Sequence, residues 1–261
     1  MNVTESRFKN RQLHMEDYLQ MVSAEQKEYA EVFDYSKITE KSGVITDYWT
    51  NNLLDLILRK DNLNEAYKQV KRNKGKGGID GMQVDELLPF LRENQEILIQ
   101  EIREGRYKPN PVRRVEIPKE TKGEFRKLGV PTVADRVIQQ AIAQELSSIY
   151  EDQFSENSFG FRPKRGAHDA LRQCQKNVND GYVYVVDMDL EKFFDTVCQS
   201  KLIEVLSRTI KDGRVISLIH KYLNAGVIAN GMFERTEVGM PQGGPLSPLL
   251  SNVMLNELDK E

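Results

Sequence analysis

The chain has 261 residues, and 39% of them are hydrophobic, which is enough to bury a substantial core in one domain or two lobes. Its apolar runs fall well short of the roughly 18 residues of a membrane span, and its first residues are polar. We therefore expect neither a transmembrane segment nor a secretory signal, and predict a cytoplasmic protein. Two cysteines and three scattered histidines signal neither a disulfide framework nor a zinc site.

Residues 1–50 lack a sustained pattern, and we predict an N-terminal extension ahead of the main fold. A helix is expected from Asn62, which could cap it together with Glu65. The glycines of GKGGIDG, residues 75–81, end this helix. Their spacing fits neither the dinucleotide fingerprint nor the Walker loop, so we predict a flexible connection. A second helix is expected near Pro89–Arg103.

Residues 106–127, RYKPNPVRRVEIPKETKGEFRK, carry eight basic residues against three acidic ones within a net charge of −3. VRRVEIP and the later RKLGVP have strand-like compositions, with TKGEF between them as a turn, so a basic hairpin is predicted. Such a hairpin could bind phosphates. Composition alone leaves open the alternative of a solvated surface, the commoner role of a charge run.

Two helices are predicted after the hairpin. Thr132 and Asp135 fit the start of a helix that runs to about Tyr150, with one apolar face for the core. A further helix from about Ala167 places Cys174 on an apolar stripe, where we expect a small buried side chain.

Residues 182–197, YVYVVDMDLEKFFDTV, are predicted to begin as a buried strand, yet they carry four carboxylates. On a strand, Asp187 and Asp189 would share one face at about 6.6 Å separation. Buried carboxylates without partners are costly, so such acids should be paired, neutralised or bound to a hard cation such as Mg²⁺. Solvated acids at the end of a strand are the alternative.

The last third of the chain contains three more predicted elements. A helix is expected at about Ser200–Ile210, and Asn230-Gly231 favours a type I′ hairpin between Val227 and Val238. Ser247 and Pro248 suit the cap and first turn of a final helix, with an apolar stripe at Leu250, Val253, Met254 and Leu258.

Several blocks resemble bacterial group II intron reverse transcriptases. VVDMDLEKFFDTV and GMPQGGPLSPLLSN are similar to two hallmark palm blocks of that family. NKGKGGIDG, YKPNPVRRVEIPK, RKLGVPTVADRVIQQAI and FSENSFGFRPKRGAHDAL resemble the preceding blocks in the same order, so the resemblance covers roughly residues 50–261.

The resemblance implies an α+β fold, with the fingers and a partial palm of a right-hand polymerase. Residues 51–180 would form a fingers-like region with the basic hairpin, and residues 181–261 a partial palm. The implied activity is RNA-directed DNA polymerisation, in a group II intron-encoded protein that also binds intron RNA to aid splicing and mobility. Implied partners are group II intron RNA, RNA/DNA primer-template and dNTPs, with no membrane; a homodimer stays open.

The resemblance also implies roles for single residues. Asp189 would be the catalytic acid and Mg²⁺ ligand, six residues before Asp195 in the D-L-E-K-F-F-D run. Phe194 would lie under the incoming sugar and exclude a 2′-hydroxyl, whereas Phe193 would pack inward; core packing is the alternative for both. The other expected contacts are with the nucleotide at Lys119, Arg126 and Gln242, and with RNA at Arg113, Arg114, Arg162 and Arg165.

The sequence departs from the family pattern at two points. Cys198 stands where the family usually has Asn or a similar polar residue. The chain also stops before the aromatic-Ala-Asp-Asp block whose acids complete the metal site, so we expect RNA binding without catalysis. Rival interpretations are an RNA-binding or dimerising module, and a related reverse transcriptase of retron or diversity-generating type. YKPNPVRRVEIPK favours the group II family.

Overall fold

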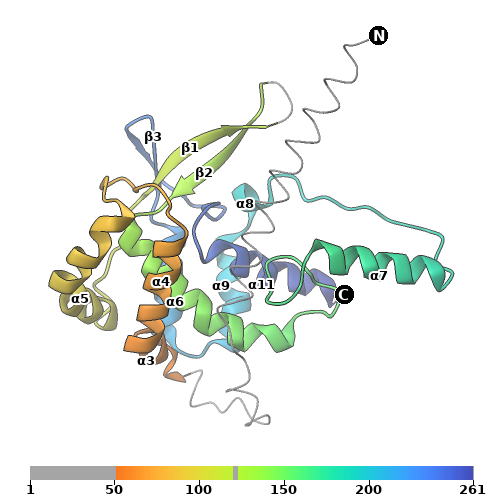
Figure 1. The fold of residues 1–261 in the computed structure, drawn as a ribbon, viewed down its shortest axis with the longest axis horizontal. Helices are drawn as coiled ribbons and strands as arrows, with labels where there is room; N and C mark the ends of the chain where they lie inside the picture. Colours follow the sequence, from red (N-terminus) through yellow and green to blue (C-terminus); the bar gives the residue numbers. More distant parts are fainter. Residues whose placement is uncertain (1–50, 120–122, 261) are drawn as a thin grey trace. The chain divides into compact units, whose positions relative to one another are not determined.

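The protein was analysed as a computed structural model that describes residues 51–119 and 123–260. The predicted N-terminal extension lies outside the described residues. Internal contacts divide the chain into two compact units. The described part of the smaller unit is Ser155–Val186, and the larger unit comprises residues 51–154 and 187–260 (Figure 1).

The larger unit is built mainly of helices around one long central helix, α6 (Figure 1). The side chain of Thr132 accepts a hydrogen bond from the Asp135 N–H and caps this helix, as predicted. α6 contacts α3, α4 and α11. The helices of the unit are α3 (Leu53–Ile57), α4 (Lys60–Arg72), η3 (Val84–Glu86), α5 (Leu87–Arg103), α6 (Val133–Tyr150), η4 (Glu151–Gln153), α8 (Phe193–Thr196), α9 (Gln199–Thr209), α10 (Gly213–Leu223) and α11 (Ser247–Asp259).

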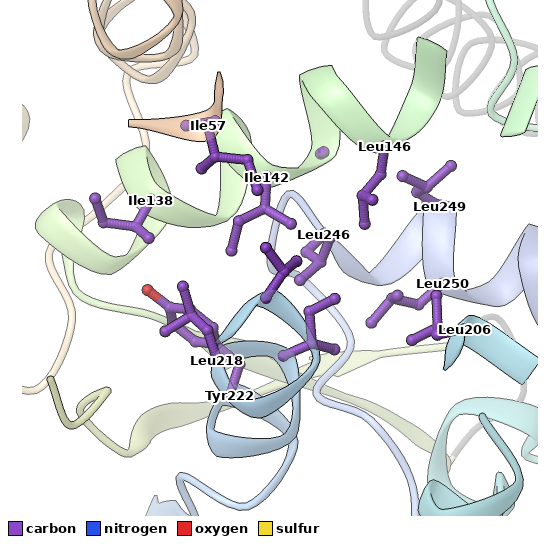
Figure 2. Packing of buried hydrophobic residues seen from close by; sticks show 14 of the residues in the cluster. Ile57, Ile138, Ile142, Leu146, Leu206, Leu218, Tyr222, Leu246, Leu249 and Leu250 are labelled. Carbon is purple, nitrogen blue, oxygen red and sulfur yellow. The ribbon is translucent and has the colours of Figure 1, made fainter. Parts of the chain in front are cut away.

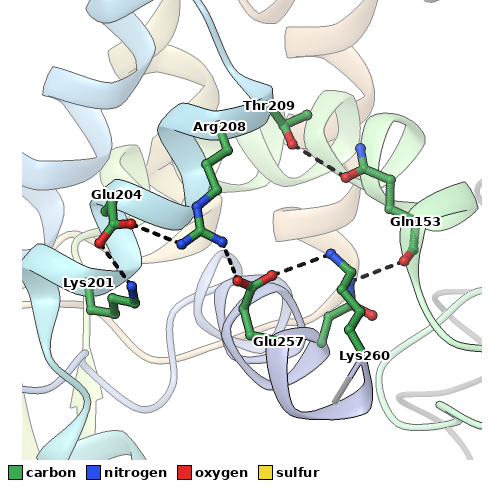
Figure 3. Close-up of polar contacts among 8 residues, drawn as sticks. Gln153, Lys201, Glu204, Arg208, Thr209, Glu257 and Lys260 are labelled. Atoms are coloured by element: carbon green, nitrogen blue, oxygen red, sulfur yellow. Dashed lines mark hydrogen bonds and ion pairs between the residues drawn. The ribbon is translucent and has the colours of Figure 1, made fainter.

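Apolar side chains from most of these helices form the core. Figure 2 shows Ile138, Ile142 and Leu146 of α6 lying among side chains of α3, α9, α10 and α11. Many of these side chains are fully buried, so burial of apolar surface holds the helices together. An exposed network adds to the α9–α11 contact, since Arg208 bonds both Glu204 and Glu257 (Figure 3). None of the described helices combines the length and apolar character that crossing a membrane requires.

Three helix predictions need correction. α4 begins at Lys60, and Asn62 is buried within its first turn, where it donates to the carbonyls of Ile57 and Ala141 instead of capping the helix. Ser247 is the first residue of α11 and not its cap, and Leu258 is exposed, so the apolar stripe ends earlier. α3 and α10 were not predicted.

A four-stranded sheet in the order β2-β1-β3-β4 covers one end of the larger unit. β1 (Val112–Pro118) and β2 (Phe125–Val130) form the predicted basic hairpin, and β3 (Val227–Ala229) and β4 (Met232–Glu234) form the second. Asn230 and Gly231 have φ of 52° and 79°, which confirms the type I′ turn. β1 pairs parallel with β3, so segments predicted as fingers and palm share one sheet.

The strand predicted at the start of residues 182–197 is absent from the described structure. Residues 182–190 form no regular element, and Tyr184 and Val186 are 93% and 82% exposed. Apolar, β-branched residues favour a strand, but a strand also needs a neighbour for its N–H and C=O groups, and no described strand supplies one.

The described part of the smaller unit contains α7 (Ala167–Asn179), the helix predicted there. The burial predicted for Cys174 is wrong, since its side chain is exposed. Leu171 and Val178 on the same stripe are exposed too, because no described residue covers this face of α7.

Candidate functional site

A groove of about 480 Å³ opens in the larger unit beside the sheet. Arg114 of β1, Lys127 of β2 and Phe194 of α8 line it, together with the loop of residues 235–242. It therefore joins three segments that are distant in sequence. Three residues predicted for binding, Arg114, Phe194 and Gln242, meet here; their roles stay predictions.

Backbone hydrogen bonds fix the 235–242 loop on both sides of the groove. The Gly129 N–H of β2 donates to the Gln242 carbonyl at 2.7 Å, and the Met240 N–H donates to the Phe194 carbonyl at 2.7 Å. The loop thus binds the hairpin at one end and α8 at the other. This connection brings Phe194 and Gln242 to the same groove.

Glycine is required at two positions of this connection. Gly239 has φ of +81°, and a Cβ there would lie 2.7 Å from the Phe194 carbonyl oxygen. Gly243 has φ of +119°, and its Cβ would lie 2.9 Å from the Gly129 carbonyl oxygen. A side chain at either site would combine backbone strain with a clash, so both glycines allow the loop to approach its neighbours closely.

The two phenylalanines of α8 differ in their surroundings. Phe194 lines the groove, whereas Phe193 does not, and both rings pack partly against the core. Their centroids lie 5.7 Å apart with the planes at 79°, an edge-to-face contact. Phe194 is therefore the one of the two rings that lines the groove, and its role beside a sugar stays a prediction.

Lys119 and Arg126 lie at the outer end of the basic hairpin. Arg126 is paired opposite Ile117. Lys119 is two residues after Ile117, just beyond the end of β1, and its N–H continues the pairing by donating to the Glu124 carbonyl, so the alternation of a strand puts both cations on one face. Arg114 and Lys127 alternate to the other face and line the groove. Lys119 is exposed and its Nζ lies 3.1 Å from a Glu124 carboxylate oxygen. The predicted triphosphate ligands are therefore not groove-lining residues in this structure.

Arg113 has a structural contact that the sequence did not suggest. Its guanidinium donates to the Gly77 carbonyl at 2.9 and 3.3 Å, and Arg136 donates to the Lys76 carbonyl. Gly77 and Gly78 are buried, and a Cβ on Gly78 would lie 2.6 Å from Thr132 backbone atoms. The glycine-rich segment is therefore packed against the start of α6, contrary to the predicted flexible connection.

In the smaller unit, Arg162 and Arg165 both bond their own loop. Arg162 is 5% exposed, and its guanidinium donates to the Ser155 and Ser158 carbonyls at 2.6 and 3.0 Å. Arg165 is half-buried; it donates to the Glu156 carbonyl and lies over the Phe159 ring, 5.8 Å from its centroid. These contacts give Arg162 a structural role and leave Arg165 the more exposed of the two; contact of either with RNA stays a prediction.

Asp189 is exposed, and no described residue donates a hydrogen bond to its carboxylate or forms an ion pair with it. Within the described ranges, no three Asp, Glu, His or Cys side chains lie close enough to hold a metal ion. A carboxylate is a suitable ligand for Mg²⁺, which requires about six oxygen donors. The described residues therefore fit one ligand of a magnesium ion and do not form a complete site.

Sequence reasoning named Gln242 at the end of the 235–242 loop but missed residues 235–238, and it missed the residue that holds the loop, Gln199. Its buried amide reaches this loop across about forty residues of sequence, and neither periodicity nor local motifs report such a contact. Cys198, which precedes it, is the exposed N-cap residue of α9. A hydrogen bond with Ser200 is the main cause of the lowered pKa of the Cys198 thiol.

Residues 117–261, more than half of the chain, match the sequence model of the family described as reverse transcriptase (RNA-dependent DNA polymerase). The group II intron-encoded protein LtrA of Lactococcus lactis subsp. cremoris is 38% identical over 224 residues, 86% of this chain and 37% of that protein. Protein YkfC of Escherichia coli (strain K12) is 40% identical, covering 80% of this chain and 56% of its own length. The putative COX1/OXI3 intron 2 protein of Saccharomyces cerevisiae is 35% identical over 235 residues, which are 87% of this chain and 26% of that protein.

Among solved structures, a chain of the partial Cas6-RT-Cas1–Cas2 complex resembles this fold with a TM-score of 0.53 at 22% identity. The likeness covers 80% of this chain and 34% of that chain, and at this identity it concerns the fold alone. It agrees with the α+β fold predicted from the sequence. The chain spans between about a quarter and somewhat over half of the curated relatives named above. The predicted boundary between fingers and palm at residue 180 stays a prediction.

Proposed function

This chain belongs to the reverse transcriptase family, and from that membership we propose that it is the polymerase part of a group II intron-encoded protein. The proposed reaction joins a dNTP to a primer 3′-hydroxyl on an RNA template. The parent protein would also bind its intron RNA and aid splicing and mobility. The observation that carries the proposal is the groove that Phe194 and Gln242 line together.

The groove offers an incoming nucleotide both cations and an apolar surface. Arg114, Lys127 and Arg235 supply positive charge for phosphates, although the carboxylates of Asp195, Glu234 and Glu237 line the same groove and Arg114 lies 4.0 Å from that of Glu234. The Phe194 ring supplies an apolar surface beside a sugar. Lys119 and Arg126, on the opposite face of the hairpin, would contact the triphosphate or the template strand. In the proposed role these residues orient the nucleotide and stabilise negative charge.

We further propose that Asp189 binds Mg²⁺ during this reaction. This ion would be one of two that together polarise the primer hydroxyl and stabilise the leaving pyrophosphate. The support is the chemistry of the residue, an exposed carboxylate with no partner among the described residues. The remaining ligands would come from other residues, so the 261-residue chain is proposed to bind RNA without extending a primer.

RNA binding is tested by the salt dependence of affinity. Phosphate binding releases counterions, so replacing Lys119 and Arg126 by Ala should flatten the plot of log K against log salt by about 0.7 for each phosphate of single-stranded RNA that is no longer neutralised. Filter binding across a salt series measures this slope. The matched control replaces Lys201 and Arg208 of α9, two cations already paired with Glu204, and should leave the slope unchanged. An unchanged slope in the hairpin variant would remove these two residues from the RNA interface.

A further inference from the structure

The buried amide of Gln199 holds the loop that completes the groove. Gln199 is the first residue of α9 and is 6% exposed. Its Nε2 donates to the carbonyls of Gly239 at 2.9 Å, Leu223 at 3.2 Å and Thr236 at 3.4 Å. One side chain thus connects α9, the end of α10 and two points of the 235–242 loop. We propose that Gln199 is a positioning residue that sets the groove between Phe194 and Gln242, and with it the choice of nucleotide.

The neighbouring hydrogen bonds show how a change at Gln199 reaches the groove. The Gly239 N–H donates to the Val197 carbonyl at 2.8 Å, so the Gly239 peptide region is bound through both its N–H and its carbonyl. The next residue, Met240, donates to the Phe194 carbonyl. Gln242 follows two residues later. A displacement of Gly239 is therefore transmitted directly to α8 and to the predicted nucleotide residue.

A second set of bonds joins the start of the loop to α10. The Thr236 hydroxyl donates to the Leu223 carbonyl at 2.7 Å and accepts from the Gly226 N–H at 3.3 Å. The Gln199 amide donates to the same Leu223 carbonyl and also to the Thr236 carbonyl, so it bonds both residues that this contact joins. Residues 235–242 form no helix or strand, and these contacts, with the backbone bonds above, replace regular secondary structure in holding them. Removing the amide leaves the buried Gly239 carbonyl without this donor, which is costly and favours local opening, whereas the Leu223 carbonyl keeps its bond from Thr236.

The effect on the nucleotide rests on the proposed function, whereas the effect on the loop does not. The first experiment therefore measures the loop alone, by amide hydrogen exchange in the 261-residue protein. Gln199→Met keeps the approximate shape of the side chain and removes its donors. We expect peptides covering residues 235–242 to exchange about tenfold faster than in the unchanged protein.

Gln144→Met is the matched control. Gln144 is also a buried glutamine whose Nε2 donates to neighbouring groups, here the side chain and carbonyl of Asn62 in α4. Its replacement should accelerate exchange in α4 and leave the 235–242 loop unchanged. If Gln199→Met left the loop protected, or if both variants opened it equally, the positioning role would be overturned.

The second experiment measures nucleotide choice by primer extension on an RNA template, with a length of the gene product that synthesises DNA. Gln199→Met should raise KM for dNTP by about five- to tenfold while kcat changes by less than about twofold, because the loop orients the nucleotide and takes no part in bond formation. The preference for dNTP over rNTP should fall in the same variant. An equal effect of Gln144→Met, or a loss confined to kcat, would contradict the proposal. Absence of synthesis by every length of the unchanged protein would refute the proposed function, and hydrogen exchange would still decide whether Gln199 holds the loop.

Discussion

At the scale of the residue, a buried polar cluster links the base of the hairpin to α6 and α10. Asp135 is 1% exposed and accepts hydrogen bonds from the Tyr107 hydroxyl at 2.5 Å and the Thr132 hydroxyl at 2.6 Å. The Asn110 N–H and amide also donate to it. Tyr222 lies beside Tyr107, with ring centroids 6.4 Å apart, and among the described residues its buried hydroxyl forms no hydrogen bond of good geometry, although it lies close enough to Tyr107 and Asp135 to interact with them. Burial raises the pKa of the Tyr222 phenol well above its ordinary value, so it stays neutral.

The two tyrosines of this cluster should respond differently to removal of the hydroxyl. Tyr222→Phe removes an unsatisfied buried group, so the free energy of unfolding should stay the same or rise by up to about 1 kcal/mol. Tyr107→Phe removes a donor to a buried carboxyl group and should lower it by about 1.5–3 kcal/mol. Urea denaturation of the two variants measures both values. Equal destabilisation would show that the Tyr222 hydroxyl does have a partner in solution.

A second residue-scale prediction separates the two aromatic side chains of α8. Because Phe194 lines the groove, Phe194→Val should open space beside the sugar and admit ribonucleotides. Phe193→Val should mainly lower stability, by roughly 1–3 kcal/mol, since this ring packs on the core and not in the groove. Incorporation of dNTP and rNTP by a DNA-synthesising length of the protein distinguishes them. If only the Phe193 variant accepted ribonucleotides, Phe193 and not Phe194 would be the residue beside the sugar, and our assignment of this block would be wrong by one residue.

At the scale of the element, Asp212 joins two helices that the sequence did not predict. Its carboxylate caps α10 by accepting from the Arg214 N–H at 3.0 Å, and it also accepts from the Leu54 N–H of α3 at 3.0 Å. The Arg214 guanidinium pairs with the same carboxylate. Burial acts to raise the pKa of Asp212, but the hydrogen bonds from Arg214 and Leu54 outweigh it, so the pKa is lowered.

The lowered pKa of Asp212 predicts a dependence of stability on pH. A carboxyl group whose folded pKa lies below its ordinary value of 3.8 contributes stability that is fully present above that value and is lost as the pH falls through the folded pKa. Asp212→Asn should therefore lower the free energy of unfolding by about 1–2 kcal/mol at neutral pH and by less in acid. Asp55→Asn, an exposed partner of the same Arg214, should cost under about 1 kcal/mol. Urea denaturation between pH 2 and 7 measures the free energy of unfolding of Asp212→Asn and of the unchanged protein. If the difference between them did not change with pH, the lowered pKa of Asp212 would be contradicted.

The elements that the sequence predicted correctly are those with local signals. α6 has its cap and its first turn within four residues, and the β3–β4 hairpin has its Asn230-Gly231 turn between its own two strands; the turn predicted at TKGEF lies partly outside the described residues. Residues 182–190 have strand composition too, but a strand forms only beside a partner, and composition does not report whether a partner is present. The predicted burial of Cys174 was wrong for a similar reason, since an apolar stripe on a helix is buried only where another element covers it.

At the scale of the whole molecule, the groove depends on contacts between segments far apart in the sequence. β1 and β2 come from residues 112–130, α8 from 193–196, and the loop from 235–242. Residue pattern alone could not place Gln242 beside Phe194; the family resemblance suggested both, and the backbone bonds of Met240 and Gly129 explain their approach. The resemblance did not suggest Gln199. Its amide donates only to backbone carbonyls, and every residue has a carbonyl, so the partners leave no recognisable pattern in the sequence.

The last prediction concerns Asp189 and the completeness of the metal site. Two magnesium ions need several carboxylates, and the described residues gather no group of three potential ligands. On the proposal that Asp189 is one of several metal ligands, the 261-residue protein should bind RNA and make no DNA with Mg²⁺ and primer-template. In a length of the gene product that does synthesise DNA, Asp189→Asn should lower turnover by several orders of magnitude with RNA binding kept, because it removes stabilisation of the transition state and not uniform binding.

Asp187→Asn is the matched control for that experiment, since this acid is also exposed and lies only two residues away. It should reduce turnover far less, because the resemblance assigns the metal to Asp189 alone. Primer extension on an RNA template, with filter binding of the same RNA, separates loss of chemistry from loss of affinity. DNA synthesis by the 261-residue protein would show that its own carboxylates suffice for catalysis. Equal losses from the two substitutions would instead mean that both acids serve the metal, and that the strand-like spacing of Asp187 and Asp189 matters more than the family register.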